Sequence, residues 1–189
     1  MDIKEFTQDF HDNIKIAVEM SNADPDEELA TAILEYIEDS GEVNVPELCV
    51  FQKTRTRLTA YDYNDEAESL DLFYLIKADT LLGKVNKNKV QQGFNFLMAS
   101  YREAMNDTLL KSVNVSDNDE IVEVAKLVKS TKGKINQLRL YIITDGLTDT
   151  DAALAAVESD DGEYIIEYNV WDMQRVYQQH NIRAGKEKV

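Results

Sequence analysis

The chain has 189 residues, a formal net charge of −16 and a sequence pI near 4.4. This length suffices for one domain with a sizeable core, and a hydrophobic content of 43% with seven Gly and two Pro excludes a low-complexity chain. No apolar run approaches the ~18 residues that a membrane helix needs. A negative field of this size repels nucleic acid, so only weak nucleic-acid binding is expected, at local basic groups such as residues 53–57 and 126–139.

Two further features bear on the compartment. Residues 1–6 show no basic start followed by an apolar run, so we expect no secretory signal. The single cysteine, Cys49, cannot form an internal disulfide and lies in an apolar run, which indicates a buried apolar residue. We therefore expect a cytoplasmic protein with no membrane contact.

The first half of the chain predicts two helices and three strands. Apolar residues three and four positions apart predict a helix over residues 4–20. Asp24 as N-cap, Pro25 as first helical residue and Gly41 as terminator bound a second helix. A short strand at 47–52 precedes a β-hairpin with strands at 57–63 and 70–76. The second hairpin strand is apolar on both faces, which is typical of a central strand covered by helices.

The second half of the chain predicts alternating helices and strands. The first expected elements are a helix from Val90 to about Leu110, a helix carrying Ile121 to Val128 and a strand at 137–144. A short helix is expected next, capped by Thr148 or Asp149 and carrying Ala152, Ala153, Ala156 and Val157. A strand at 163–170 and a helix opened by Asp172 follow. This order predicts one α/β domain over residues 1–182, with an open mixed β-sheet and helices on both faces. A polar tail at 183–189 follows.

One group of carboxylates and lysine with catalytic potential lies on the hairpin and the helix before it. Metal-dependent nucleases of the PD-(D/E)xK type place an Asp at one strand end, Asp/Glu-x-Lys on the next strand and a Glu on an earlier helix. The candidates are Asp62 on the first strand, Asp71 and Lys77 on the second, and Glu28 or Glu35 on the helix. An intact site of this kind would bind Mg²⁺ or Mn²⁺.

The decisive triplet, however, is Leu75-Ile76-Lys77, with leucine where the carboxylate should be. Losing that ligand lowers affinity for a divalent ion. We therefore favour a structural hairpin with solvated carboxylates, without a cofactor or an assigned catalytic or metal residue. The alternative is an active nuclease with a relocated carboxylate, Asp71 or Asp79. His11 and His180 lack zinc-ligand spacing and are interpreted as structural.

Two segments resemble the N-terminal region of the abortive-infection phage-resistance (AIPR) family of bacterial proteins. They are Leu58-Thr59-Ala60-Tyr61 with Asp65-Glu66 and Leu70-Asp71-Leu72-Phe73, and the later run Val170-Trp171-Asp172-Met173-Gln174-Arg175-Val176-Tyr177. The resemblance implies a role in anti-phage defence and a restriction-endonuclease-like core. Where the family often carries Asp-Gly-Tyr, this chain has Thr59-Ala60-Tyr61, so a second expected carboxylate is missing.

Family members are usually longer, so the resemblance implies that this chain is the N-terminal domain of a longer protein. Its partner would then be a missing C-terminal domain of the same chain or another protein; the residue pattern makes no prediction of the oligomeric state. The functional hypothesis is a non-catalytic or degenerate endonuclease-like domain for sensing or interaction. The alternative is an active divalent-metal-dependent nuclease of the PD-(D/E)xK type.

Overall fold

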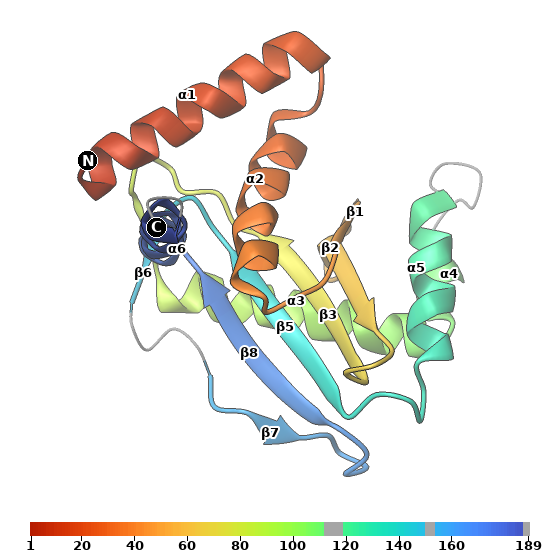
Figure 1. The fold of residues 1–189 in the computed structure, drawn as a ribbon. Coiled ribbons are helices and arrows are strands. Elements are labelled where there is room, and N and C mark those ends of the chain that lie inside the picture. Colours follow the sequence, from red (N-terminus) through yellow and green to blue (C-terminus); the bar gives the residue numbers. More distant parts are fainter. Residues whose placement is uncertain (112–118, 150–153, 187–189) are drawn as a thin grey trace.

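The computed structural model describes residues 1–111, 119–149 and 154–186 and has an α/β fold (Figure 1). Its helices are α1 (Ile3–Ser21), α2 (Pro25–Ser40), α3 (Lys87–Met105), α4 (Thr108–Lys111), α5 (Asp119–Ser130) and α6 (Met173–Lys186). Its strands are β1 (Glu47–Gln52), β2 (Arg57–Asn64), β3 (Ser69–Leu75), β4 (Lys84–Val85), β5 (Gln137–Ile143), β6 (Leu147–Thr148), β7 (Val157–Glu158) and β8 (Ile165–Trp171). None of the helices in the described ranges is long and apolar enough to cross a membrane.

Six strands form one mixed sheet in the order β1-β2-β3-β5-β8-β7. β1, β2 and β3 make an antiparallel meander, and β5 and β8 continue the sheet parallel to β3. β7 is antiparallel to β8, while β4 and β6 form a separate parallel pair. The predicted mixed sheet is therefore confirmed, with β3 in a central position.

Helices cover both faces of this sheet and create two cores. α3 and α5 pack on one face, where Leu70 and Leu72 of β3 point. α1, α2 and α6 pack on the other face, where Phe73 of β3 stacks on Tyr141 of β5 with ring centroids 4.7 Å apart. The alternation of buried side chains along β3 explains why this strand is apolar on both faces.

The start and end of α2 follow the local signals in the sequence. The Asp24 side chain accepts hydrogen bonds from the backbone N–H groups of Asp26 (2.8 Å) and Glu27 (3.2 Å). Pro25 occupies the first turn, where a missing N–H costs nothing. Gly41 ends the helix with a left-handed φ of 81°. The first turn of α2 is thereby held by its own cap.

The short helix expected after Asp149 is wrong for the residues that the structure describes, from Leu154 to Val157. Ala152 and Ala153 lie outside the described residues, but Ala156 is not helical and Val157 belongs to β7, paired with Ile166 of β8. A β-branched valine is favoured in a strand, and Val157 gains backbone pairing at the sheet edge.

Two helices also differ in extent from their predicted ranges. The helix expected from Val90 to about Leu110 is interrupted after Met105, because Asp107 adopts a left-handed φ of 59°, and α4 follows as a separate turn. At the other end of the chain α6 continues to Lys186, although a polar tail was expected from Arg183. Arg183 pairs with Asp39 of α2 at 2.6 Å, which ties this last turn to the domain.

Candidate functional site

A pocket opens where β2 and β3 separate at the end of the hairpin farthest from its turn. The last regular pair of this ladder is Ala60 with Phe73. Beyond it, the backbone N–H of Leu75 donates at 3.0 Å to a side chain of the facing strand, the hydroxyl of Thr59. The resulting pocket has a volume of about 230 Å³, and Thr59, Leu75 and Lys77 all line it. The structure thus brings together the two positions that lack an expected carboxylate and the lysine.

Lys77 meets a carboxylate from α2 in this pocket. Its Nζ lies 2.7 Å from Oδ1 of Asp26, and both side chains are about half exposed. The hydrogen bond to Asp26 raises the pKa of Lys77, burial opposes the rise, and the charges of Asp26, Asp145 and Asp24 add to it. Lys77 therefore stays protonated and its charge is engaged by the helix, not by a neighbouring strand.

Asp26 is the pocket residue that the sequence analysis did not select. A signal for it exists, because Asp26 precedes the buried residues Leu29 and Ile33 by three and seven positions and so shares their face of α2. Glu28 and Glu35 lie on another face and line a groove between α1 and α2. The helical period thus favours Asp26 over both glutamates as the residue that faces the sheet.

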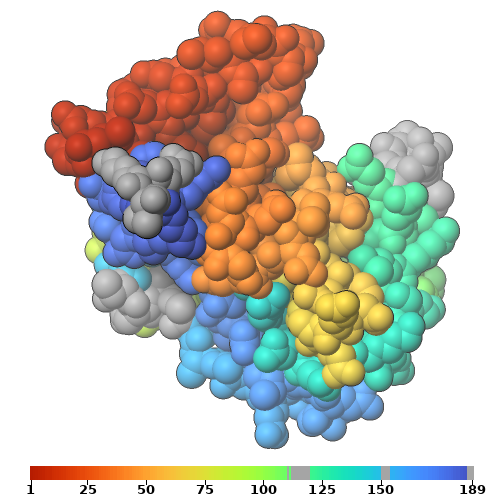
Figure 2. Space-filling model, viewed as in Figure 1, coloured from red at the N-terminus to blue at the C-terminus, as the bar shows by residue number. Residues whose placement is uncertain are grey.

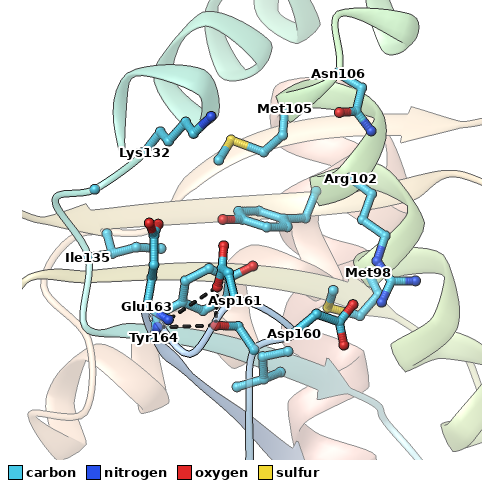
Figure 3. A pocket seen from close by; sticks show the side chains of 14 residues that line it. Met98, Arg102, Met105, Asn106, Lys132, Ile135, Asp160, Asp161, Glu163 and Tyr164 are labelled. Carbon is cyan, nitrogen blue, oxygen red and sulfur yellow. Dashed lines mark hydrogen bonds between the residues drawn. The ribbon is translucent and has the colours of Figure 1, made fainter.

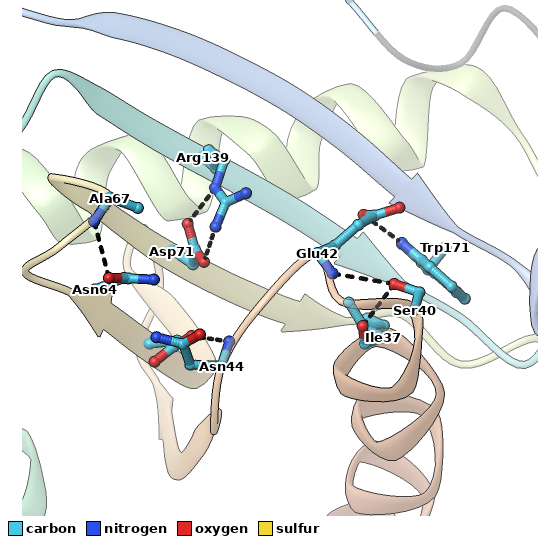
Figure 4. A network of polar contacts seen from close by, with 10 residues as sticks. Ile37, Ser40, Glu42, Asn44, Asn64, Ala67, Asp71, Arg139 and Trp171 are labelled. Carbon is cyan, nitrogen blue, oxygen red and sulfur yellow. Dashed lines mark hydrogen bonds and ion pairs between the residues drawn. The ribbon is translucent and has the colours of Figure 1, made fainter.

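Asp62 and Asp71 lie together, but near the turn of the hairpin. The two residues face each other in the β2–β3 register. Asp62 accepts a hydrogen bond from the backbone N–H of Asn44 at 2.7 Å. Asp71 accepts two bonds from Arg139 of β5, each 2.6 Å long (Figure 4). Both carboxylates are buried and bound by protein donors, so the expectation of solvated carboxylates on this hairpin is wrong for this pair.

The pKa of the Asp71 carboxyl group differs from that of a solvated aspartic acid. The residue is fully buried, and this burial raises its pKa to about 6, although Arg139 opposes the rise. Lys77 follows Asp71 by six positions, four of them along β3, and so lies beyond the far end of this strand at an extended span of about 20 Å. Asp62 and Asp71 therefore do not share a site with Lys77. Asp79 is also apart: its side chain is 89% exposed and lies 3.7 Å from Lys89.

The oxygen ligands around Lys77 are few. Of the lining residues, Asp26, Gln52, Thr59 and Tyr74 carry side-chain oxygens, and the Tyr74 hydroxyl is engaged by Arg57. Phe51, Leu58 and Leu75 are among the apolar residues of the wall. Within the described ranges no group of three or more His, Cys, Asp or Glu residues is arranged to hold a metal ion. Mg²⁺ and Ca²⁺ require about six oxygen ligands, so the described side chains of this pocket supply an incomplete set.

The two histidines lie outside this pocket and join elements of the fold. His11 of α1 places Nε2 at 3.5 Å from Asp145, whose other oxygen accepts the backbone N–H of Ala78 at 2.7 Å. His180 of α6 contacts the hydroxyl of Tyr36 at 3.3 Å and packs on Phe6.

A second cavity of about 260 Å³ lies between α3, the turn before β5 and the β7–β8 turn (Figure 3). Tyr101 and Tyr164 line it, with Arg102 and Lys132 among its charged residues. One of its acids, Asp161, accepts a hydrogen bond from the Ser159 hydroxyl at 2.6 Å and from the Glu163 backbone N–H at 3.1 Å. Asp161 thus holds the turn together. None of the residues predicted as catalytic lines this cavity.

The fold and pocket define an α/β domain with a mixed sheet and a pocket that contains Lys77 at the separated ends of β2 and β3. Residues 29–178 match the model of the abortive infection phage resistance protein N-terminal domain. Because the match spans most of the chain, the protein belongs to this family, as the hairpin and the segment from Val170 to Tyr177 predicted. Membership identifies it as a phage-defence protein. No curated protein and no solved structure matches the chain.

Proposed function

We propose that this chain is a catalytically degenerate, restriction-endonuclease-like domain that serves phage defence by sensing or interaction. The arrangement of its strands supports this view. An antiparallel meander followed by a parallel strand leaves the ends of β2 and β3 at an open corner. A PD-(D/E)xK site needs its strand carboxylates and lysine at such a corner, with an acid from the preceding helix beside them.

The observation that carries the proposal is the identity of the residues at this corner. Lys77 is present, and α2 supplies the acid Asp26 at 2.7 Å. The two strand positions beside it hold Thr59 and Leu75, which are bonded to each other through the threonine hydroxyl. A hydroxyl and an alkyl group stand where the nuclease pattern has two anionic ligands, and Lys77 neutralises the remaining carboxylate, Asp26, so these side chains supply no net negative charge to attract a divalent ion. The acidic surface, which repels nucleic acid, agrees with a non-nucleolytic role.

A restoration experiment tests this proposal. We expect the wild-type chain to leave plasmid DNA, single-stranded DNA and RNA intact in Mg²⁺ or Mn²⁺. The Thr59→Asp/Leu75→Glu double variant should gain Mn²⁺ binding by calorimetry, because it returns two carboxylates to the pocket. Thr59→Asn/Leu75→Gln is the matched control, since it adds side chains of the same size without charge. Gain of Mn²⁺ binding in both variants, or in neither, contradicts the proposal.

The same assay decides the alternative of an active nuclease. In that case the wild-type chain cleaves nucleic acid, and Lys77→Ala abolishes cleavage because the lysine positions or activates the attacking water. The Asp71→Ala variant tests whether Asp71 is the relocated carboxylate proposed from the sequence, because cleavage should then be lost. Circular dichroism checks that this variant is folded. Wild-type cleavage that depends on Lys77 would overturn the degenerate reading.

A further inference from the structure

The two edges of the sheet are unequal. β7 forms one edge with only two residues, whereas β1 forms the other with six. Within the described ranges the backbone of β1 pairs with β2 alone, so its outer side presents unpaired N–H and C=O groups. Val50, in the middle of β1, is 42% exposed. At the β7 edge only Ile165 and Ile166 of β8 are paired, whereas β1 is a six-residue edge strand that is long enough to accept a further strand.

A groove runs beside this edge on the α2 side. Its volume is about 530 Å³, and it is lined mainly by the apolar residues Leu34, Pro46 and Leu48 and the acids Glu35, Glu38 and Glu47. Figure 2 shows the surface of α2 and the segment after it, in orange, between α1 and α5. The pairing of β1 with β2 is irregular between Leu48 and Phe51, and Glu47 and Leu48 are the β1 residues that line the groove. An extended segment beside these two residues would direct alternate side chains toward the groove.

Acids also lie on the opposite side of β1. α2 and α5 both contact this strand (Figure 1). On α5, Glu120 and Glu123 are exposed. The charge of Glu120 acts on Cys49 of β1, and the charge of Glu123 acts on Tyr61 of β2. Carboxylates therefore flank the β1 edge from both helices.

Basic residues do not balance this charge locally. From Glu19 to Gln52 the sequence holds ten acids and no Lys or Arg. Three of these acids, Asp26, Asp39 and Glu42, pair with basic residues from elsewhere in the chain. Among the residues described, no ion pair engages the groove acids Glu35, Glu38 or Glu47. Charge complementarity thus favours a basic occupant.

A second copy of this chain fits the edge poorly. Pairing β1 with β1 of another copy would bring Glu35 and Glu38 of both copies toward one axis, and like charges brought together across an interface cost several kcal/mol. Nucleic acid is repelled by the same carboxylates. A basic peptide segment meets both requirements, because its backbone pairs with β1 and its side chains reach the acids on either side.

We propose that β1 is a docking strand for an extended, lysine- or arginine-rich segment of a partner protein, which adds to the sheet beside β1. This inference rests on the proposed interaction function and specifies the chemistry of the partner. Main-chain hydrogen bonds to β1 would give affinity, and the acids of α2 and α5 would select basic side chains.

A short fluorescent peptide of alternating lysine and valine tests this proposal with the full 189-residue chain. We expect saturable binding by fluorescence anisotropy, and no binding of a glutamate–valine peptide. Methylating alternate backbone nitrogens keeps the charge and removes donors, so it should weaken binding at least about tenfold, or 1.4 kcal/mol. Absence of binding, or equal binding of the methylated peptide, overturns the docking strand.

Charge-matched variants locate the binding site. Glu35→Gln/Glu38→Gln should weaken the lysine–valine peptide several-fold, whereas Asp9→Asn/Glu19→Gln, which removes two exposed acids from α1, should leave its affinity unchanged. Equal losses in both variants indicate general attraction to an acidic protein and overturn the proposal. A dimer in sedimentation that Val50→Lys dissociates would assign the edge to a second copy and also overturn it.

The peptide titration and the metal assay fail independently. Nuclease activity of the wild-type chain would overturn the degenerate site and leave the peptide titration unaffected. Lack of peptide binding would overturn the proposal that β1 is a docking strand, but it would not affect the proposal that the pocket at Lys77 is a degenerate nuclease site.

Discussion

The two ends of the β2–β3 hairpin carry similar residues in opposite environments. Near the turn, Asp71 is fully buried and held by two hydrogen bonds from Arg139. At the other end, Lys77 and Asp26 form a half-exposed pair at the mouth of a pocket. The buried pair joins β3 to β5 and is closed to ligands, while the exposed pair joins the segment after β3 to α2. Charge alone therefore does not mark a candidate site; unfinished strand pairing and accessibility do.

The sharpest test of this comparison removes one partner of the buried pair. Arg139→Ala leaves the Asp71 carboxylate buried without its cation, which costs about 3–5 kcal/mol in the free energy of unfolding. Urea denaturation measures the loss. A double variant, Asp71→Leu/Arg139→Met, should recover most of it because no uncompensated charge remains. A single-variant loss below about 1 kcal/mol would place the pair in the class of surface ion pairs.

The protonation of Asp71 gives a second, smaller effect. Its pKa in the folded chain is about 6, above the ordinary value of 3.8, because burial disfavours the carboxylate more than Arg139 favours it. Between these two values the folded state binds more protons than the unfolded state, so the unfolding free energy falls as the pH rises from 4 to 6. This loss is on the order of 2 kcal/mol.

The measurement compares wild type with Asp71→Asn, which cannot titrate at this position. Denaturation at pH 4 and pH 7 should show wild type losing stability relative to the variant as the pH rises. If the difference in unfolding free energy between wild type and Asp71→Asn stays constant from pH 4 to pH 7, Arg139 cancels the effect of burial on the pKa of Asp71.

The smallest effect is expected at the exposed pair. Lys77→Ala removes a half-exposed ion pair with Asp26, and exposed pairs contribute about 0–1 kcal/mol. Urea denaturation should therefore separate Lys77→Ala clearly from Arg139→Ala. A loss above about 2 kcal/mol would show that Lys77 supports the fold and would remove the contrast between the two ends of the hairpin.

The sequence predicted those elements correctly whose determinants all lie within a short stretch of the chain. Asp24, Pro25 and Gly41 bound α2 because caps act within a few residues. The alternation along β3 predicted its central place because each face meets a different core. The region after Asp149 was predicted wrongly, because pairing of Val157 with Ile166 depends on a contact that a short window of sequence does not contain.

The candidate site was predictable only in part, for a geometric reason. Thr59, Leu75 and Lys77 were selected from the pattern and lie in one pocket. Asp62 and Asp71 were grouped with Lys77 because they share a hairpin, but residues near the turn are remote from residues at its open end. Selecting Asp26 as a site residue would have required knowledge of which turn of α2 lies beside the end of β3. Register and helix placement, which depend on long-range packing, supplied what residue types did not.

The single cysteine provides a native reporter for the edge strand. Cys49 is buried in β1, and burial together with the Glu120 charge raises its pKa to about 12. Its thiolate is therefore scarce while β1 is in place. Alkylation of Cys49 then measures how often this strand detaches from the sheet, without any added label. A strand docked along β1 would slow that reaction, so one thiol reports both the local dynamics of the sheet edge and its occupancy.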